Sequence, residues 1–293
     1  MNDEKEKEKE YFITRYSLIP DVQIDLESYS GTTKEAKFTN WLNSFTQEKK
    51  KEIDCSGNHF ALYCKCISNA CFLMVFAKEL KDVVGQKTDD GIEDTPISNY
   101  KKCNILINTV NQWMIIEKCT DISQNIISQK NMIANVIAHF MKPKHLYFEL
   151  GLISQKNDFW QYVCSHKDSL TDVIITLSSP NFLKGITSVN DFLKETNETY
   201  NNTSVSIHLK NKDGRLNIDE SNQFLRDAVR YSSAGCGKWT LKSSTNKKNY
   251  NNEDNPFIVR LPENISQLKE SDKEKIYATF EHVKHIDPEC VEE

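Results

Sequence analysis

The sequence predicts an α+β protein with two domains, a hairpin-rich N-terminal domain and a C-terminal domain built on a mixed sheet. Pairs of alternating apolar runs joined by short turns indicate hairpins in the first half, whereas strand and helix patterns alternate in the second. The 293 residues suit one large domain or two ordinary ones, and 38% hydrophobic with 27% charged residues is a globular composition. We therefore expect a disordered charged tail at 1–10, an N-terminal α+β domain at 11–143 and a C-terminal α+β domain at 144–293.

The elements of the N-terminal domain follow from the spacing of its apolar residues. Phe38, Trp41, Leu42 and Phe45 recur at helical spacing, whereas the runs on both sides of the turn at 68–70 alternate as strands do. In chain order we expect a strand at 11–17, a helix at 34–51, a hairpin at 59–79, a Gly-, Asp- and Pro-rich loop at 84–99, a second hairpin at 104–118 and a helix at 121–141. Lys142 and Pro143 end that helix and place the domain boundary.

The C-terminal domain alternates β-branched runs with amphipathic segments. In chain order we expect a strand at 146–153, a helix at 158–170, a strand at 172–177, a helix at 189–200, a strand at 204–209, a helix at 219–231, a strand at 238–241, a polar loop at 246–255, a strand at 257–261 and a helix at 271–285. Gly235 follows the helix at 219–231, where glycine accepts the positive φ of a helix C-terminus.

The N-terminus and the cysteines indicate a cytoplasmic protein. The first ten residues, MNDEKEKEKE, lack the apolar core of a signal peptide, and no apolar run reaches the roughly 18 residues of a membrane span. The nine cysteines are an odd number and sit mostly in apolar runs, which suits reduced, packed thiols in a reducing compartment. We expect no direct insertion into a membrane.

One group of residues invites a zinc interpretation. Cys55, His59, Cys64, Cys66 and Cys71 have the right chemistry, but structural zinc sites usually pair two C-x2–4-C knuckles. Here the two closest cysteines are separated by a single residue on one proposed strand. We expect buried thiols, no metal and no cofactor.

The sequence carries no strong catalytic motif. It has neither a G-x-S-x-G elbow nor a P-loop. A metal-dependent nuclease would need carboxylates that converge on Mg²⁺, and the candidates Glu149 and Asp172 stand singly. The sequence favours binding over catalysis, with a nuclease as the enzymatic alternative.

Positive charge is concentrated between residues 203 and 250. This stretch holds nine basic and four acidic residues, about +5 in a chain of net charge −5. The basic residues are Lys210, Lys212, Arg215, Arg226, Arg230, Lys238, Lys242, Lys247 and Lys248. Arg226 and Arg230 share one helix face, and Tyr231, Trp239 and Tyr250 interleave with the bases, a pattern that attracts phosphates. We predict a nucleic-acid-binding surface here; the alternative is an ordinary solvated face or a dimer contact.

Five stretches between Tyr11 and about Leu241 carry a resemblance in the order of elements: YFITRYS, NWLNSF, the hairpin from FALYCKC to CFLMVFAK, the hairpin from CNILIN to WMIIE, and the helix at 121–140. This order resembles the RexA family, sensor components of prophage-encoded phage-exclusion systems. KNKDGRL and GCGKWTL also resemble the end of uncharacterised bacterial defence proteins. The likeness is one of pattern, so no residue role is carried over.

The resemblance implies a cytosolic anti-phage protein that binds nucleic acid or a phage component, as a homodimer, with a separate membrane protein as effector. Together with the basic stretch it predicts a sensor that binds DNA rather than RNA, double-stranded and without sequence specificity. The alternatives are the nuclease and a protein-interaction module that senses or inhibits a phage or host protein; the acidic first half suits the module, because negative surface repels DNA.

Overall fold

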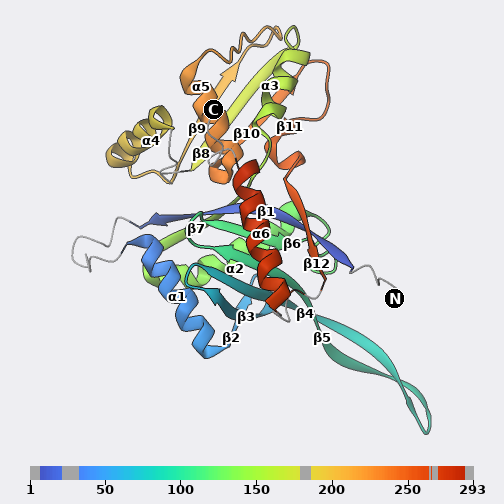
Figure 1. The fold of residues 1–293 in the computed structure, drawn as a ribbon. Helices are drawn as coiled ribbons and strands as arrows, with labels where there is room; N and C mark the ends of the chain where they lie inside the picture. Colours follow the sequence, from blue (N-terminus) through green and yellow to red (C-terminus); the bar gives the residue numbers. More distant parts are fainter. Residues whose placement is uncertain (1–6, 22–32, 179–185, 264, 266–269, 288–293) are drawn as a thin grey trace, which may run out of the picture.

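Two antiparallel sheets and the helices packed on them make up the described part of the chain, and the α+β class is confirmed (Figure 1). The computed structural model describes residues 7–21, 33–178, 186–263, 265 and 270–287. A large sheet occupies the lower part of Figure 1 and a small sheet the upper part. No helix in these ranges is long and apolar enough to cross a membrane.

The large sheet has eight strands, and β1, next to one edge, pairs with three of them. Its strands are, in sheet order, β12 (Ile258–Pro262), β1 (Glu8–Pro20), β6 (Trp113–Glu117), β5 (Gly91–Asn108), β4 (Cys71–Thr88), β3 (Asn58–Ser68) and β2 (Lys50–Cys55), with β7 (Leu146–Leu152) also beside β1. One edge of β1 pairs with β6, while the other pairs first with β12 and then with β7. A single strand thus joins segments more than 100 residues apart.

Helices cover both faces of the large sheet. Because side chains alternate along a strand, Phe12 and Tyr16 of β1 point to one face, and Tyr11 and Ile13 to the other. The first face packs against α1 (Lys34–Glu48) and α2 (Ile126–Met141). The second packs against α6 (Glu270–Ile286), the red helix in front of the sheet in Figure 1. Both cores are fully buried.

The small sheet carries helices on one face only. Its strands, in sheet order, are β11 (Tyr250–Asn251), β10 (Gly237–Ser243), β8 (Leu170–Ser178) and β9 (Ser204–Lys210). The helices α3 (Lys156–Ser165), α4 (Thr187–Tyr200) and α5 (Gln223–Tyr231) pack with Val173, Ile175 and Trp239 in one core. Its ladders are all antiparallel in the described residues, where we expected a mixed sheet; a parallel bridge joins Leu170 and Arg215 outside the ladders.

The predicted hairpins at 59–79 and 104–118 are confirmed, and two other local predictions are corrected. Residues 8–10 of the expected tail belong to β1, because β12 pairs with them; residues 1–6 lie outside the described part. The predicted loop at 84–99 is a continuous hairpin of β4 and β5. Gly85 and Pro96, which suggested a loop, are tolerated because no further strand of the described chain lies beside this ribbon.

The expected boundary at Pro143 does not coincide with the division between the sheets. After β7 the chain leaves the large sheet, forms the small sheet and its helices, and returns through β12 and α6. The two parts touch closely where a methyl group on Gly151 of β7 would overlap the carbonyl of Gly235. Gly235 has φ +84°, the helix-end conformation expected of it.

Candidate nucleic-acid interface

The small sheet has one face that none of its helices covers. Side chains that point away from the core alternate with Val173, Ile175, Trp239 and Leu241. We call this surface the open face; its residues are Asp172, Ile174 and Thr176 of β8, Ser206, His208 and Lys210 of β9, and Lys238, Thr240 and Lys242 of β10.

A buried carboxylate organises the cations of the open face. Cross-strand register places Lys210 on one side of Asp172 and Lys242 on the other. His208 Nε2 lies 2.7 Å from Asp172 Oδ1 and Lys210 Nζ lies 3.6 Å from the same oxygen, while the Asp172 side chain is only 8% exposed. Burial would raise the pKa of the Asp172 carboxyl, but hydrogen bonds from His208 and Thr171 and the charges of Lys210 and Lys242 outweigh it and lower that pKa. Asp172 therefore stays ionised and holds the cations around it.

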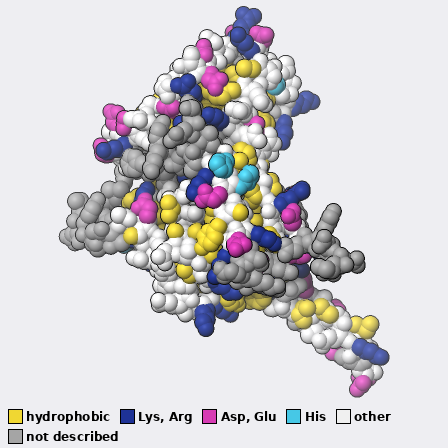
Figure 2. Space-filling view, viewed as in Figure 1, with side chains coloured by type: hydrophobic (Ala, Val, Ile, Leu, Met, Phe, Trp, Pro, Cys, Tyr) yellow, Lys and Arg dark blue, Asp and Glu magenta, His cyan; other side chains and the backbone are white. Residues whose placement is uncertain are grey.

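Six of the nine predicted basic residues gather at one end of the small sheet. Lys210 and Lys242 close the open face there, Lys212 and Arg215 lie on the turn that follows β9, and Lys247 and Lys248 lie on the loop that follows β10. We call these six residues the basic end. Figure 2 shows Lys and Arg side chains around the upper end of the molecule, with acidic side chains among them.

The loop after β10 is tied to the α3–β8 connection by polar contacts. The hydroxyls of Ser169 and Ser243 lie 2.8 Å apart, and Asn246 Nδ2 lies 3.0 Å from His166 Nε2. These bonds fix the loop that carries Lys247 and Lys248. Lys167 lies on the same α3–β8 connection. The charge count from 203 to 250 missed it, because Lys167 comes near the loop after β10 only when the strands of the small sheet pair.

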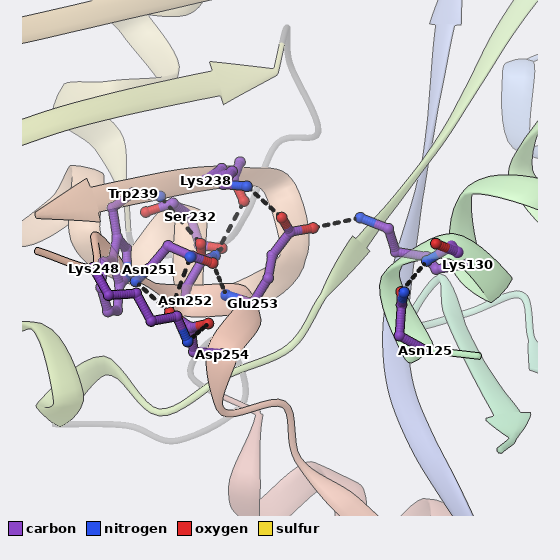
Figure 3. Close-up of polar contacts among 12 residues, drawn as sticks. Asn125, Lys130, Ser232, Lys238, Trp239, Lys248, Asn251, Asn252, Glu253 and Asp254 are labelled. Carbon is purple, nitrogen blue, oxygen red and sulfur yellow. Dashed lines mark hydrogen bonds and ion pairs between the residues drawn. The ribbon is translucent and has the colours of Figure 1, made fainter. Parts of the chain in front are cut away.

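Lys238 lies at the opposite end of the open face and belongs to the junction with the large sheet (Figure 3). The Glu253 carboxylate, 10% exposed, binds the half-exposed Lys238 and the buried Lys130 of α2, with Lys130 Nζ 2.7 Å away. Burial would raise the pKa of Glu253, but both lysines outweigh it and lower that pKa. Lys238 is thus engaged within the fold.

Arg226 and Arg230 lie on α5, in the helix layer behind the small sheet, and not on the open face. Arg226 donates to the Gln223 side chain one turn earlier. The structure therefore separates these two arginines from the basic end, although the sequence places all nine bases within 48 residues.

The aromatic residues near the bases are structural. Trp239 and Tyr231 are fully buried, and Tyr250 stacks on Tyr162 with ring centroids 4.9 Å apart. Our interpretation of these rings as part of the binding surface is therefore wrong, because they point into the core or onto α3. The open face carries no Phe, Tyr or Trp; His208 supplies its one aromatic ring, and Ile174 is its only large apolar residue.

Neither the zinc nor the nuclease interpretation gains a site from the described residues. Within them no three His, Cys, Asp or Glu side chains are grouped to hold a metal. Cys64 is buried, and burial raises the pKa of its thiol to about 12. Glu149 lies on β7 of the large sheet and Asp172 on β8 of the small one.

Comparison with family models and with curated proteins gives no relative for this chain. No protein-family model matches it, and no curated protein matches it significantly. Its function must therefore be argued from the open face and the basic end themselves.

Proposed function

We propose that the protein binds nucleic acid, double-stranded DNA rather than RNA, at the open face and basic end, without catalysis of its own. The observation that carries this proposal is the row Lys210–Asp172–Lys242 on a sheet face that none of the described helices covers. The carboxylate holds neighbouring cations in place, and Lys212 and Arg215 extend the row with exposed charges. Lysine and arginine side chains on such a surface bind phosphates and release counterions.

The shape and chemistry of the open face favour phosphate contacts over base recognition. Three spacings between four strands make the sheet about 14 Å wide before side chains are added. The major groove is about 12 Å wide and admits a helix or a two-stranded ribbon. Because the open face carries no Phe, Tyr or Trp, and its one imidazole, His208, is held by Asp172, it offers no row of rings on which unpaired bases could stack. Contact with the duplex backbone, independent of sequence, is the binding mode that fits.

The salt dependence of binding tests this proposal quantitatively. If Lys210, Lys212, Arg215 and Lys242 each neutralise one phosphate, log K falls with log salt at a slope of about −3.6. We expect Lys212→Gln with Arg215→Gln to reduce that slope by about 2 in an anisotropy titration with a DNA duplex. Both side chains are exposed, so the double variant should fold normally.

Arg226→Gln with Arg230→Gln is the matched control, since it removes the same charge from the helix layer. We expect it to leave the slope unchanged. An equal loss in this control would move the site to α5, and a wild-type affinity that does not respond to salt would contradict phosphate binding altogether. Intact DNA after incubation with Mg²⁺ is expected, whereas degradation would favour the nuclease alternative.

We further infer from the resemblance to the RexA family that this binding serves phage defence, with a separate membrane protein as effector. Phage plaques should be fewer on bacteria that express the wild-type chain than on bacteria that express Lys212→Gln with Arg215→Gln. Equal plaque numbers with no chain, wild type and variant would contradict the defence role but leave DNA binding intact.

A further inference from the structure

The hairpin of β4 and β5 continues beyond the large sheet as a free two-stranded ribbon. β3 pairs with β4 only as far as Lys78, and β6 pairs with β5 only from Ile105 onward. Between these limits β4 and β5 pair with each other alone, through ten residue pairs from Glu79–Tyr100 to Thr88–Gly91. We call residues 79–100 the arm; it projects about 30 Å at the strand rise and points away from the molecule (Figure 1).

The arm exposes apolar side chains. Val83 is 65% exposed and Ile92 78% exposed, and Val84 and Ile97 are also exposed. Tyr100, at the base of the arm, is 43% exposed and meets the edge of the His59 ring of β3. None of the three buried clusters includes a residue of the arm. An isolated two-stranded hairpin is marginally stable in water, and unpaired strand edges invite pairing with another chain. These properties indicate a partner surface.

Three of the apolar residues lie on one side of the arm. Glu79 pairs with Tyr100, Val83 with Pro96 and Lys87 with Ile92, so Tyr100, Val83 and Ile92 share a face. A methyl group on Gly85 would lie 2.8 Å from Ile92 Cγ2, which places the Ile92 side chain over the glycine. The glycine lets the apolar row continue to the end of the ribbon.

The charge of the arm identifies the kind of surface that it fits. It contains six acidic and two basic residues, a net charge of −4. The acidic residues are Glu79, Asp82, Asp89, Asp90, Glu93 and Asp94. Such a ribbon repels nucleic acid and repels another arm, so its partner surface must be positive.

We propose that the arm docks on the open face and basic end of a second copy of this chain. The basic end carries the opposite charge, and the open face is a sheet surface that none of the described helices covers, wide enough to receive a ribbon. The arm and the small sheet lie at opposite ends of one molecule, so the arm cannot reach the small sheet of its own chain (Figure 1). Two antiparallel copies make the contact twice and close a twofold dimer.

The arm would occupy the surface that the proposed function assigns to DNA, so the dimer contact and DNA binding exclude each other there. The dimer contact is therefore tested without DNA. We would measure molar mass by light scattering during gel filtration at tens of micromolar protein, at low and high salt. Glu93→Lys with Asp94→Lys reverses charges on the arm, and Lys212→Glu with Arg215→Glu reverses charges on the basic end. We call these the arm-reversed and the sheet-reversed variants. All four residues are exposed.

We expect a salt-sensitive wild-type dimer, weakened roughly tenfold or more by either reversal because like charges then face each other. An equimolar mixture of the two reversed variants should restore the dimer, since each positive arm then meets a negative sheet and each negative arm a positive one. Glu195→Lys with Glu198→Lys, on the exposed side of α4, is the control and should dimerise as wild type does.

Three results would overturn the proposal. A monomeric wild-type chain would exclude a second copy as the occupant and assign the arm to another protein. A dimer that ignores the arm reversal would place the interface elsewhere. A dimer that is weakened by the arm reversal, but not by the sheet reversal and not restored in the mixture, would show that the arm docks on another surface.

Discussion

Replacement of Asp287 by Asn should destabilise the protein strongly, because Asp287 balances a buried arginine. Arg15 is 1% exposed and Asp287 is fully buried, and their side chains form an ion pair. Trp113 Nε1 also donates to Asp287 Oδ2, at 2.6 Å, and Arg15 Nε donates to the Ala234 carbonyl, at 2.8 Å. The pair therefore joins β1 and β6 to the end of α6 and to the turn that leads into the small sheet.

The expected loss follows from burial. Removal of one partner from a buried ion pair leaves an uncompensated charge and costs about 3–5 kcal/mol. Asp287→Asn keeps the size of the side chain and an oxygen acceptor, so the loss reports mainly on charge. We expect the free energy of unfolding to fall by that amount in urea denaturation followed by tryptophan fluorescence and circular dichroism.

Glu281→Gln on the same helix is the control. It breaks the exposed pair with Lys284, and such surface pairs contribute about 0–1 kcal/mol. A loss below about 1 kcal/mol for Asp287→Asn, no larger than that of the control, would refute the argument that the pair is buried and structural.

Three other predictions concern the junction between the sheets. Glu253→Gln should lower the free energy of unfolding by about 1–3 kcal/mol in urea denaturation, because it removes the carboxylate charge from the buried Lys130 ammonium. Lys238→Gln should lower it by less than about 1 kcal/mol, because Lys238 is half-exposed. Folding lowers the pKa of the Glu253 carboxyl, so its contribution to stability is complete above the ordinary pKa of 4.5 and is lost as pH falls through the folded pKa. The free energy of unfolding should therefore fall less steeply with acid in Glu253→Gln than in the wild type. An unchanged pH profile would contradict this. Gly151→Ala should lower the melting temperature, since the added methyl group would overlap the Gly235 carbonyl; an unchanged melting temperature would show that the junction can open.

The candidate site could be predicted in part from the sequence. Alternation along 204–210 separates Val205 and Ile207 from His208 and Lys210, so the polar face of this strand can be recognised from its residues alone. The burial of the Asp172 carboxylate within that face cannot be recognised in this way. Asp172 acquires its lysine neighbours only when β9 and β10 pair with β8 on both sides, and α4 separates β9 from β8 in the sequence while β10 follows only after α5.

For two parts of the predicted site, the sequence could not show whether the residues lie on the open face or in the helix layer and core behind it. Arg226 and Arg230 are amphipathic-helix residues by spacing, and spacing does not say which face of a sheet the helix will cover. Trp239 alternates with Lys238, so a strand was predicted correctly, but the burial of its ring depends on α3 packing against the sheet. Only the neighbouring elements decide which of two alternating faces becomes solvent-exposed.

The sequence by itself determined the α+β class, the two confirmed hairpins and the local excess of positive charge, because each depends on residues within one element or one stretch of chain. The tertiary structure alone decided that β1 pairs with β12 and β7, and that residues 79–100 form a free arm. It also decided that the chain forms the small sheet between β7 and β12, two strands of the large sheet. Strand partners are chosen by burial of side chains distant in sequence, and local periodicity carries no information about which distant strand completes the sheet.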